Sequence, residues 1–403
     1  MRPEVRQLEA QQIPEGNWDA VVAGAGPAGS TCAFWLARAG RRVLLLDKYR
    51  FPRSKPCGDL LIPDAIHELQ RSGLFDRVQA VAKKMSVIRI SSPSRIEFGV
   101  EGQYLSLSRS RLDTLLAQGA VEAGAIMAEG DVVEINNGDE SPSVTVRDLP
   151  YPVKAEYVIV ATGASVTLAN RSGMISRTEP SAVALRCYVR SPIKLDEVVI
   201  TYDRRLLPGY AWIMPLSNDV YNVGCGVTAD AGADAMHSLK ALLKTFMESF
   251  PLAKELMSKG ERLSPVSGAA LRYALEGVNS PVAGRVLATG EVIGTTFPFT
   301  GEGIGKAMHS GRLAAEAVNE ALDTNNPARL GRYQDDIREQ MAPAYVGYSV
   351  AQRWLSQPWL NDFMARRIRD SRYLQDQARR VMEETGDPRK LYAPMSILRS
   401  FFQ

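Results

Sequence analysis

The chain has 403 residues, with 48 Lys and Arg against 45 Asp and Glu, so its formal net charge is +3. Hydrophobic residues make up 45% of the chain and charged residues 23%, which is typical of globular proteins and excludes a disordered or fibrous chain. So small a charge over this length gives no indication of nucleic-acid binding, and no stretch is both apolar and long enough to span a bilayer.

The polar start of the chain and its scattered cysteines and histidines exclude further classes of protein. The first 18 residues lack the apolar core of a signal peptide. The four cysteines and three histidines lie far apart and form no C-x-x-C pair, so we expect neither a disulfide framework, nor a metal site, nor a Ser/His/Asp triad. These features indicate a cytoplasmic protein.

The first predicted elements form a strand, a glycine-rich turn, a helix and a second strand. The turn contains Gly24, Gly26, Pro27, Ala28 and Gly29; it lies between a strand at Asp19–Ala23 and a helix at Thr31–Ala39, and a strand at Arg42–Asp47 follows. The last strand ends in an acid 18 residues beyond Gly29. This order is typical of a dinucleotide-binding βαβ unit, and the alternative, a glycine turn without a ligand, does not explain the acid.

Each residue of this turn has a predicted role. Gly24 makes the tight turn, Gly26 lets the backbone approach a pyrophosphate, and Gly29 lets the helix pack on the strand. Pro27 suits the first helical turn, where its missing N–H costs nothing. The pyrophosphate would face the unpaired N–H groups of the helix N-terminus, and Asp47 would accept hydrogen bonds from a ribose.

A basic segment follows. Arg41 to Gly58 holds six Lys and Arg against one acid, and we interpret it either as a solvated loop or as a segment in which some cations face phosphates. The next predicted elements are a helix from Arg109 to about Gly124 and strands at Asp131–Ile135, Val144–Arg147 and Tyr157–Val160. The last of these strands ends in a second glycine turn at Gly163.

The second half of the chain begins with half-buried strands, which we expect to form an inserted antiparallel sheet. They are predicted at Val183–Val189, Glu197–Tyr202, Ala211–Leu216 and Val220–Val227. A helix at Met236–Phe250, a strand at Arg285–Thr289, a glycine-rich segment from Gly290 to Gly305 and a helix from Lys306 to about Leu322 follow. Beyond residue 330 we expect polar helices with scattered apolar anchors at Trp354, Trp359, Phe363, Phe401 and Phe402.

Five of these blocks together resemble the geranylgeranyl reductase family of FAD-dependent oxidoreductases, which is related to flavin monooxygenases and halogenases. The blocks are Gly24–Gly29 with Asp47, Lys55-Pro56-Cys57-Gly58, Arg109–Asp113, Pro208–Pro215 with Tyr210 and Trp212, and Gly290–Gly311. The second and fourth discriminate best, because the others are shared by many flavoproteins. Four residues depart from the family pattern. Leu112 and Met214 stand where the family has Phe, Glu291 stands where it has Asp, and Thr162 stands where the second glycine turn usually has Asp.

The resemblance implies an α/β fold with a Rossmann-like FAD-binding domain, an inserted antiparallel-sheet substrate domain and a C-terminal helical region. The expected ranges are 17–50, 101–170 and 281–330 for the first domain, 51–100 and 171–280 for the second, and 331–403 for the third. It implies FAD contacts at Gly24, Gly26, Pro27, Ala28, Gly29, Asp47, Lys48, Arg109, Gly163, Gly290, Glu291, Pro298, Gly301, Gly303 and Ile304. No second dinucleotide unit is present, so NAD(P)H or another external donor would reduce the flavin from outside.

The resemblance also suggests catalytic candidates. It places Cys57 near the flavin as a proton donor, and basic neighbours would lower the pKa of its thiol; the alternative is a structural cysteine. Tyr210 and Trp212 alternate along a strand and so share one face, where they either line a substrate cavity or belong to the sheet core.

The leading hypothesis is an enzyme that reduces carbon–carbon double bonds of a hydrophobic, isoprenoid-like substrate by hydride transfer from reduced flavin. A flavin monooxygenase is the main alternative, because the same fold carries both chemistries; a halogenase, a dehydrogenating oxidase and a non-catalytic flavin-binding partner are further ones. The apolar segment Met395–Phe402 either docks on the protein or contacts a membrane surface. The oligomeric state stays open.

Overall fold

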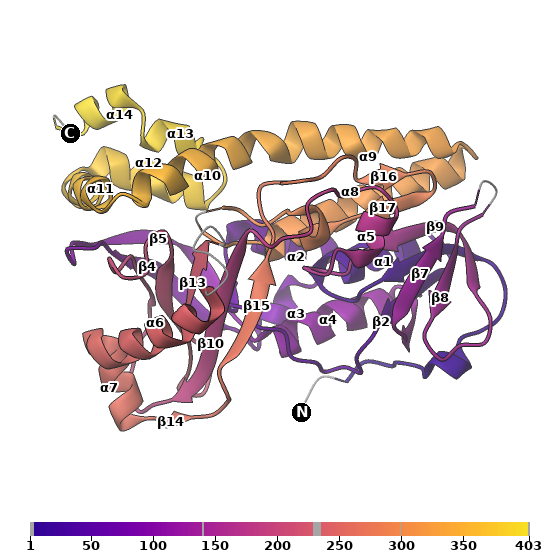
Figure 1. Ribbon diagram of the computed structural model, residues 1–403, viewed down its shortest axis with the longest axis horizontal. Coiled ribbons are helices and arrows are strands. Elements are labelled where there is room, and N and C mark those ends of the chain that lie inside the picture. Colours follow the sequence, from indigo (N-terminus) through magenta and orange to yellow (C-terminus); the bar gives the residue numbers. More distant parts are fainter. Residues whose placement is uncertain (1–3, 139–140, 229–234, 299, 402–403) are drawn as a thin grey trace.

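The protein is described by a computed structural model for residues 4–138, 141–228, 235–298 and 300–401. Two sheets lie side by side, and long helices run across both to a helical cluster at the C-terminal end (Figure 1). The longest rod consists of α9 (Gly331–Asp336), a π-helical turn (Ile337–Met341) and α10 (Ala342–Leu355). In the described part of the chain, no helix has both the length and the apolar composition needed to cross a bilayer.

The first sheet has a parallel core in the order β17, β9, β1, β2, β6. Within the described residues, this sheet comprises β1 (Trp18–Ala23), β2 (Val43–Asp47), β6 (Ile126–Glu129), β7 (Val132–Asn136), β8 (Ser143–Val146), β9 (Val153–Val160), β16 (Val282–Ala283) and β17 (Val286–Ala288). Helices cover both faces of such a sheet, which is why β2 reads as an unbroken apolar run instead of alternating.

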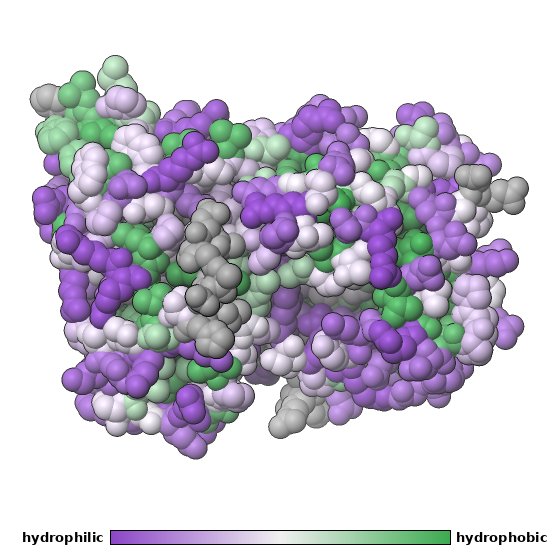
Figure 2. All heavy atoms as spheres, in the orientation of Figure 1, coloured by the Kyte–Doolittle hydropathy of each residue, from purple (hydrophilic) through white to green (hydrophobic). Residues whose placement is uncertain are grey.

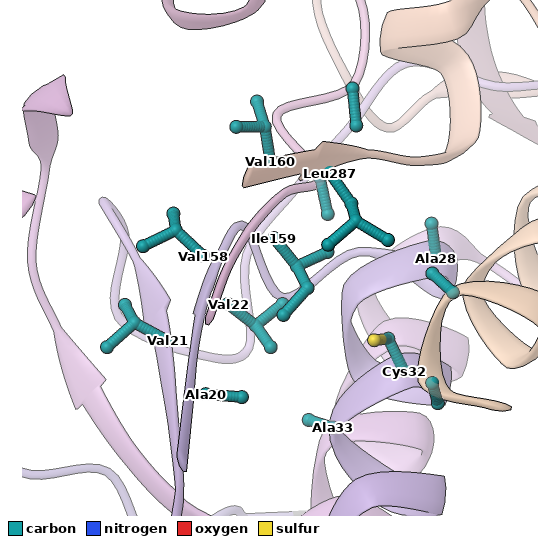
Figure 3. Packing of buried hydrophobic residues seen from close by; sticks show 14 of the residues in the cluster. Ala20, Val21, Val22, Ala28, Cys32, Ala33, Val158, Ile159, Val160 and Leu287 are labelled. Atoms are coloured by element: carbon teal, nitrogen blue, oxygen red, sulfur yellow. The ribbon is translucent and has the colours of Figure 1, made fainter. Parts of the chain in front are cut away.

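Small residues on α1 (Pro27–Arg38) allow this helix to pack closely on the sheet. Figure 3 shows Val22, Ile159 and Leu287, which are neighbours across three strands, pointing toward Ala28 and Cys32 of α1. On its other side α1 packs against α8 (Ile304–Asp323), and a Cβ at Gly311 would lie 2.2 Å from the carbonyl oxygen of Ala28. This packing fixes the N-terminus of α1 at the carboxyl ends of the strands.

The second sheet is antiparallel except for the pair β4 and β11, which run parallel. Within the described residues it comprises β3 (Leu60–Leu61), β4 (Lys83–Ser91), β5 (Glu97–Ser106), β10 (Ala182–Arg190), β11 (Val198–Thr201), β12 (Tyr210–Pro215), β13 (Val220–Thr228), β14 (Glu261–Arg262) and β15 (Ser267–Leu271). Leu185, Val223 and their neighbours form a core with α6 (Ala235–Ser249) and α7 (Pro251–Lys259) on one face. The opposite face is therefore available to line a site.

The remaining helices connect the sheets or form the C-terminal cluster. They are α2 (Pro63–Ser72), α3 (Phe75–Gln79), α4 (Arg109–Glu122), α5 (Thr167–Arg171), α11 (Pro358–Asp370), α12 (Arg372–Met382), α13 (Pro388–Leu391) and α14 (Pro394–Arg399), with 3-10 turns at Ala10–Gln12, Gly290–Ile293 and Pro327–Leu330. The predicted architecture, a Rossmann-like sheet with an inserted sheet domain and a C-terminal helical region, is confirmed. The residue boundaries of the domains stay a prediction.

Two local predictions need correction. The helix predicted from Thr31 begins at Pro27, because proline presets the first helical turn and Gly26 provides the cap. Trp359 and Phe401 are not anchors, since they are 68% and 56% exposed. Met395 and Leu398 of α14 are also exposed, and Figure 2 shows apolar residues gathered at the end of the molecule where α14 lies. Phe402 lies outside the described residues.

Candidate functional site

A cavity of about 860 Å³ extends from the N-terminus of α1 to the free face of the second sheet. This volume is in the range of cofactor and substrate sites. All but three of the predicted site residues line it; the exceptions are Gly29, Gly290 and Pro298. Gly29 and Gly290 instead allow close packing, since a Cβ at Gly29 would lie 1.8 Å from the carbonyl oxygen of Gly24, and one at Gly290 would lie 2.6 Å from the Cβ of Ala28. Pro298 is buried.

The glycine turn before α1 has the shape that a pyrophosphate requires. Gly24 has φ +110°, and a Cβ there would lie 2.3 Å from the carbonyl oxygen of Ala161, so only glycine fits. Gly26 caps α1 and faces open space, with the guanidinium groups of Arg53 and Arg109 as its nearest neighbours at 3.7 and 3.9 Å from a built Cβ. Unpaired helix N–H groups and two cations around an open position fit an anionic group.

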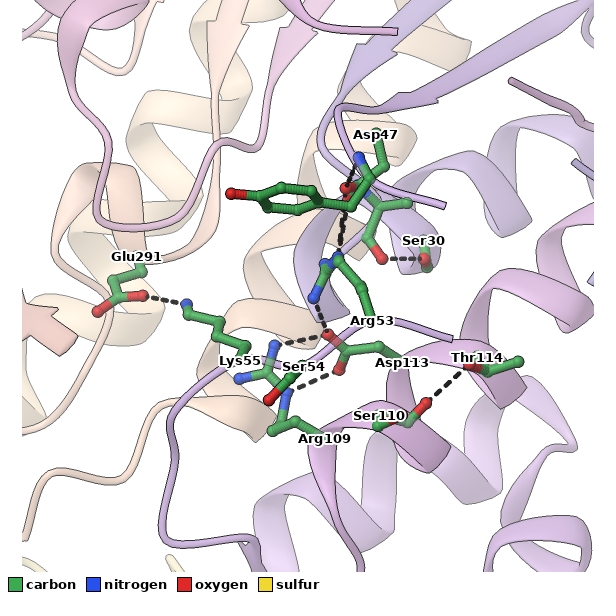
Figure 4. Close-up of polar contacts among 12 residues, drawn as sticks. Ser30, Asp47, Arg53, Ser54, Lys55, Arg109, Ser110, Asp113, Thr114 and Glu291 are labelled. Atoms are coloured by element: carbon green, nitrogen blue, oxygen red, sulfur yellow. Dashed lines mark hydrogen bonds and ion pairs between the residues drawn. The ribbon is translucent and has the colours of Figure 1, made fainter. Parts of the chain in front are cut away.

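A buried carboxylate holds these two cations in place (Figure 4). Asp113 is fully buried and accepts hydrogen bonds from Arg109 at 2.7 and 2.9 Å and from Arg53 at 2.9 Å. Burial acts to raise the pKa of Asp113, but the charges of Arg109 and Arg53 outweigh it and hold the pKa below its usual value. Arg109 thus lines the cavity with its charge already balanced.

Asp47 lies at the end of β2, as predicted. Its Oδ2 accepts the backbone N–H of Ala25 at 3.0 Å and the Nε of Arg53 at 3.1 Å, and its Oδ1 accepts the N–H of Tyr49 at 3.1 Å. Lys48 lines the cavity beside it, with its Nζ 5.0 Å from the centre of the Tyr49 ring. Asp47 is thereby oriented toward the cavity end where the ribose is expected, and its ribose contact stays a prediction.

Glu291, the departure from the family pattern, is held by the basic loop. Its Oε2 accepts a hydrogen bond from Lys55 Nζ at 2.7 Å (Figure 4). The pair lies over Gly163, where a built Cβ would be 3.3 Å from Lys55 Nζ and 3.7 Å from Glu291 Oε2. The longer side chain therefore joins the Pro-Cys-Gly loop to the second glycine turn.

The segment before α8 forms the next wall of the cavity. Gly301, Gly303 and Ile304 line it, and α8 begins at Ile304 with Gly303 as its N-cap. Tyr210 of β12 donates its hydroxyl hydrogen to the carbonyl oxygen of Thr300, which ties the second sheet to this loop. The start of α8 thus lies at the cavity wall, and the orientation of its backbone N–H groups toward the cofactor stays a prediction.

Tyr210 and Trp212 share the cavity face of β12, with their ring centres 5.8 Å apart. Trp212 fits because Gly224 of β13 leaves room for it: a Cβ there would lie 2.3 Å from the indole ring. The indole Nε1 donates to Asn222 Oδ1 at 3.0 Å. These two side chains form an aromatic wall opposite the Pro-Cys-Gly loop.

Cys57 lines the cavity, but the prediction of a lowered thiol pKa is wrong. Burial raises the pKa of Cys57, the nearby charge of Asp59 adds to the increase, and Arg109 compensates only in part. The thiol therefore stays protonated at neutral pH, as a proton donor must.

Sequence reasoning missed a polar cluster beside Cys57. Asp59 is fully buried and accepts hydrogen bonds from Tyr188 at 2.6 Å and Asn222 at 2.8 Å through Oδ2 and from the N–H of Arg109 at 3.1 Å through Oδ1. Burial raises the pKa of Asp59. Arg186, on β10, lines the cavity next to this cluster. The available signal was polar residues at alternate positions of otherwise apolar strands.

A second group of acids lies behind the loop before α8. Asp64 of α2 is buried, and its carboxyl group lies against Gly305, where a built Cβ would be 2.2 Å from Asp64 Cγ. Burial and the charge of Glu384 raise the pKa of Asp64 to about 7, although Lys306 lies 3.8 Å away. Burial likewise raises the pKa of Glu302, which lines the cavity.

Comparison with known proteins identifies relatives over most of the chain. Residues 17–244 match the family model described as FAD binding domain. Menaquinone reductase from Mycolicibacterium smegmatis is 33% identical over 353 residues, which cover 83% of each protein. Digeranylgeranylglycerophospholipid reductase 1 from Methanopyrus kandleri is 28% identical, over 82% of this chain and 88% of that protein.

Solved structures share the fold over nearly the whole length. A geranylgeranyl bacteriochlorophyll reductase-like protein from Thermoplasma acidophilum superposes with a TM-score of 0.76 at 21% identity, covering 96% of both chains. A flavin-dependent brominase superposes with a TM-score of 0.78 at 19% identity, covering 96% of this chain and 98% of its own. At these identities the structures establish the fold, which reductases and halogenases have in common.

Proposed function

The chain belongs to the FAD binding domain family, as a flavin-dependent oxidoreductase of the geranylgeranyl reductase-like group, and on this premise we propose that it reduces carbon–carbon double bonds of a hydrophobic, isoprenoid-like substrate. The names of its relatives support this substrate class, since one is a menaquinone reductase and another a digeranylgeranylglycerophospholipid reductase. NAD(P)H or another external donor would reduce the cofactor.

The observation that carries the proposal is one continuous cavity in which Cys57 links the cofactor end to the aromatic wall. On the cofactor side, the Cys57 thiol lies near Arg109. On the sheet side, the carbonyl oxygen of Cys57 accepts a hydrogen bond from Asn222 Nδ2 at 2.6 Å, and Asn222 in turn holds Trp212. A substrate lying against Tyr210 and Trp212 would therefore contact a protonated thiol.

The reaction needs a hydride on one carbon and a proton on the other. Reduced FAD would supply the hydride when it is bound. The Cys57 Sγ holds the proton, because burial keeps the thiol neutral, and the thiolate left after transfer would be stabilised by Arg109 until it regains a proton from solvent. Tyr210 and Trp212 would orient the apolar chain and exclude water.

The test uses the FAD-loaded protein, reduced with dithionite, and a polyprenyl substrate in D₂O with and without oxygen. We expect a saturated bond carrying two solvent deuteriums, formed without oxygen, because dithionite supplies only electrons and both the hydride of reduced flavin and the thiol proton exchange with D₂O. We also expect a strong loss of rate in Cys57→Ala. An oxygen-dependent product heavier by one oxygen atom would falsify the reductase and establish a monooxygenase. Unchanged rates in Cys57→Ala would remove the thiol from the mechanism.

We further propose that the C-terminal cluster contacts an anionic bilayer from which such a substrate is taken. Trp359, Met395, Leu398 and Phe401 are 55–74% exposed, and no carboxylate of the described residues pairs with the exposed cations Arg366, Arg372 and Lys390 nearby in the chain. An apolar patch with cations beside it fits a lipid surface. The residues that line the cavity include Gln352, Leu355 and Ser356, which precede α11 in the chain.

Vesicle sedimentation tests this contact. We expect binding to vesicles rich in anionic lipid and reduced binding by the double variant of Trp359→Ser and Leu398→Ser. Leu263→Ser, at an exposed apolar position beside β14, is the control. Equal binding by all three proteins, or no binding by the wild type, would refute the proposal.

A further inference from the structure

Arg186 is a buried cation on the substrate side of the cavity. Its side chain is 3% exposed, and it lines the cavity from β10. Leu185, Cys187 and Val189 alternate with it and point into the core under α6 and α7. Because successive side chains of a strand point to opposite faces, Arg186 and Tyr188 lie on the cavity face.

The guanidinium group of Arg186 has few partners. Its Nη2 lies 3.5 Å from Ser54 Oγ, at the limit of a hydrogen bond, and its carbon lies 4.2 Å from the centre of the Tyr188 ring. Its Nε is buried without a hydrogen-bond partner, and no carboxylate of the described residues lies within 4.0 Å. Buried arginines are normally paired, because removing an unpaired charge from water is energetically costly.

The other buried guanidinium groups at this cavity show what a balanced site looks like. Arg109 and Arg53 both bind Asp113, and Arg53 also binds Asp47. Asp59 is the acid that interacts electrostatically with Arg186, whose positive charge acts to lower the pKa of Asp59. Its Oδ2 already accepts two hydrogen bonds, from Tyr188 and Asn222, so Asp59 offsets the charge of Arg186 without occupying its donors.

We propose that Arg186 recognises the head group of the substrate: its guanidinium donates hydrogen bonds to a substrate oxygen while the isoprenoid chain lies along the apolar walls. This inference rests on the proposed reductase function. A guanidinium suits an electronegative oxygen acceptor, either a quinone carbonyl or a lipid phosphate. The cavity lining on the second sheet also includes apolar residues, among them Ala184, Met214 and Leu271.

The position of Arg186 favours the substrate over the cofactor as the source of this oxygen. The cofactor phosphates have their own donors at the N-terminus of α1, where Gly26 faces Arg53 and Arg109. Arg186 instead lies on the second sheet, whose cavity face also carries the aromatic wall. A polar anchor at this place would fix which double bond of a long chain reaches the cofactor.

The experiment compares Arg186→Met and Arg186→Lys with wild type and with Arg262→Met, an exposed residue of β14 outside the cavity. Each FAD-loaded protein is given a polyprenyl quinone, a polyprenyl phospholipid and a polyprenyl hydrocarbon without oxygen. We expect Arg186→Met to lower kcat/KM by about 10- to 100-fold for the preferred oxygenated substrate, the loss expected for a hydrogen bond to a charged group, and to leave the hydrocarbon within about twofold. The kcat/KM of Arg186→Lys should lie between those of wild type and Arg186→Met. The FAD affinity and Tm of both variants should stay near wild type.

Equilibrium binding separates this inference from the proposed function. A quinone with a fully saturated side chain cannot be reduced at the chain, so its affinity for the oxidised holoprotein reports head-group recognition without turnover. We expect weaker binding by Arg186→Met whether or not any substrate is reduced. Equal losses of kcat/KM on all three substrates would overturn the assignment and indicate a structural role for Arg186. A loss of FAD affinity with unchanged quinone binding would also overturn it and indicate that Arg186 binds the cofactor. Larger losses on the phospholipid than on the quinone would assign the acceptor to a phosphate.

Discussion

The buried carboxylate of Asp113 offers the sharpest test of how the cofactor end is built. Asp113→Asn keeps the size of the side chain but removes the charge that balances Arg109 and Arg53. Both cations are themselves nearly buried, with side chains 6% and 11% exposed. The substitution therefore leaves two guanidinium groups in a low-dielectric site with only Asp47 between them.

Breaking a buried ion pair by removing one partner typically costs 3–5 kcal/mol, so we expect the free energy of unfolding to fall by about 4 kcal/mol. The sign of the pH dependence follows from the lowered pKa of Asp113. A carboxyl group with a lowered pKa in the folded state contributes stability above its unfolded value of 3.8, and this contribution is lost as the pH falls through its folded value. The difference in the free energy of unfolding between variant and wild type should thus be largest at pH 7 and decrease at acidic pH.

The assay is urea unfolding at pH 7 with FAD at one saturating concentration. Glu122→Gln is the matched control, since Glu122 lies on the same helix and pairs with Arg77 at 2.6 Å, with side chains 55% and 50% exposed. An exposed pair contributes about 0–1 kcal/mol. If Asp113→Asn is no more destabilising than this control, Asp113 does not organise the two cations and the reasoning fails.

Three further predictions address other parts of the cavity. Gly29→Ala should abolish FAD binding or folding, because its Cβ would lie 1.8 Å from the carbonyl oxygen of Gly24; retention of the yellow cofactor through gel filtration would contradict this. Tyr210→Phe removes the hydrogen bond to Thr300 and should weaken FAD binding about fivefold, as followed by flavin fluorescence, for a bond of ~1 kcal/mol. The pKa of Asp64 is raised from 3.8 to about 7, so its carboxyl group costs stability as the pH rises through this window; Asp64→Asn should show a smaller fall of Tm between pH 5 and about 8 than wild type, and equal slopes would argue against a buried neutral acid.

The cofactor end could be predicted from the sequence because its determinants are local. The spacing of Gly24, Gly26 and Gly29 and the acid at Asp47 lie within one βαβ unit, where covalent connection already fixes their neighbours. The structure adds only the partners supplied from elsewhere, such as Asp113 on α4. Short-range patterns of this kind can be recognised from the sequence before the fold is known.

The polar cluster of the substrate side could not be predicted, because it is assembled from three segments far apart in the chain. Asp59 follows the Pro-Cys-Gly loop, Arg186 and Tyr188 come from β10, and Asn222 comes from β13. Only the register of β10 with β13, which pairs Tyr188 with Asn222, brings their side chains together. Strand register depends on packing across the whole sheet, which no single motif encodes. The exposure of Trp359 could not be predicted for a related reason. An aromatic residue type suggests burial, but only tertiary packing decides whether the side chain is buried.

The basic segment from Arg41 to Gly58 shows that a local excess of positive residues does not by itself indicate a phosphate-binding site. Most of its cations already have partners in the structure: Arg41 with Asp323, Arg42 with the carbonyl oxygens of Glu15 and Asn17, Arg50 with Glu9, Arg53 with Asp47 and Asp113, and Lys55 with Glu291. Within the described residues, carboxylates thus balance four of the six cations, and only Arg42 and Lys48 retain charge that could attract a phosphate over distance. Pyrophosphate recognition must depend mainly on the N–H groups and dipole at the start of α1, which act at contact range. Because salt screens charges over about 10 Å but hardly affects such contacts, FAD affinity should change little with ionic strength.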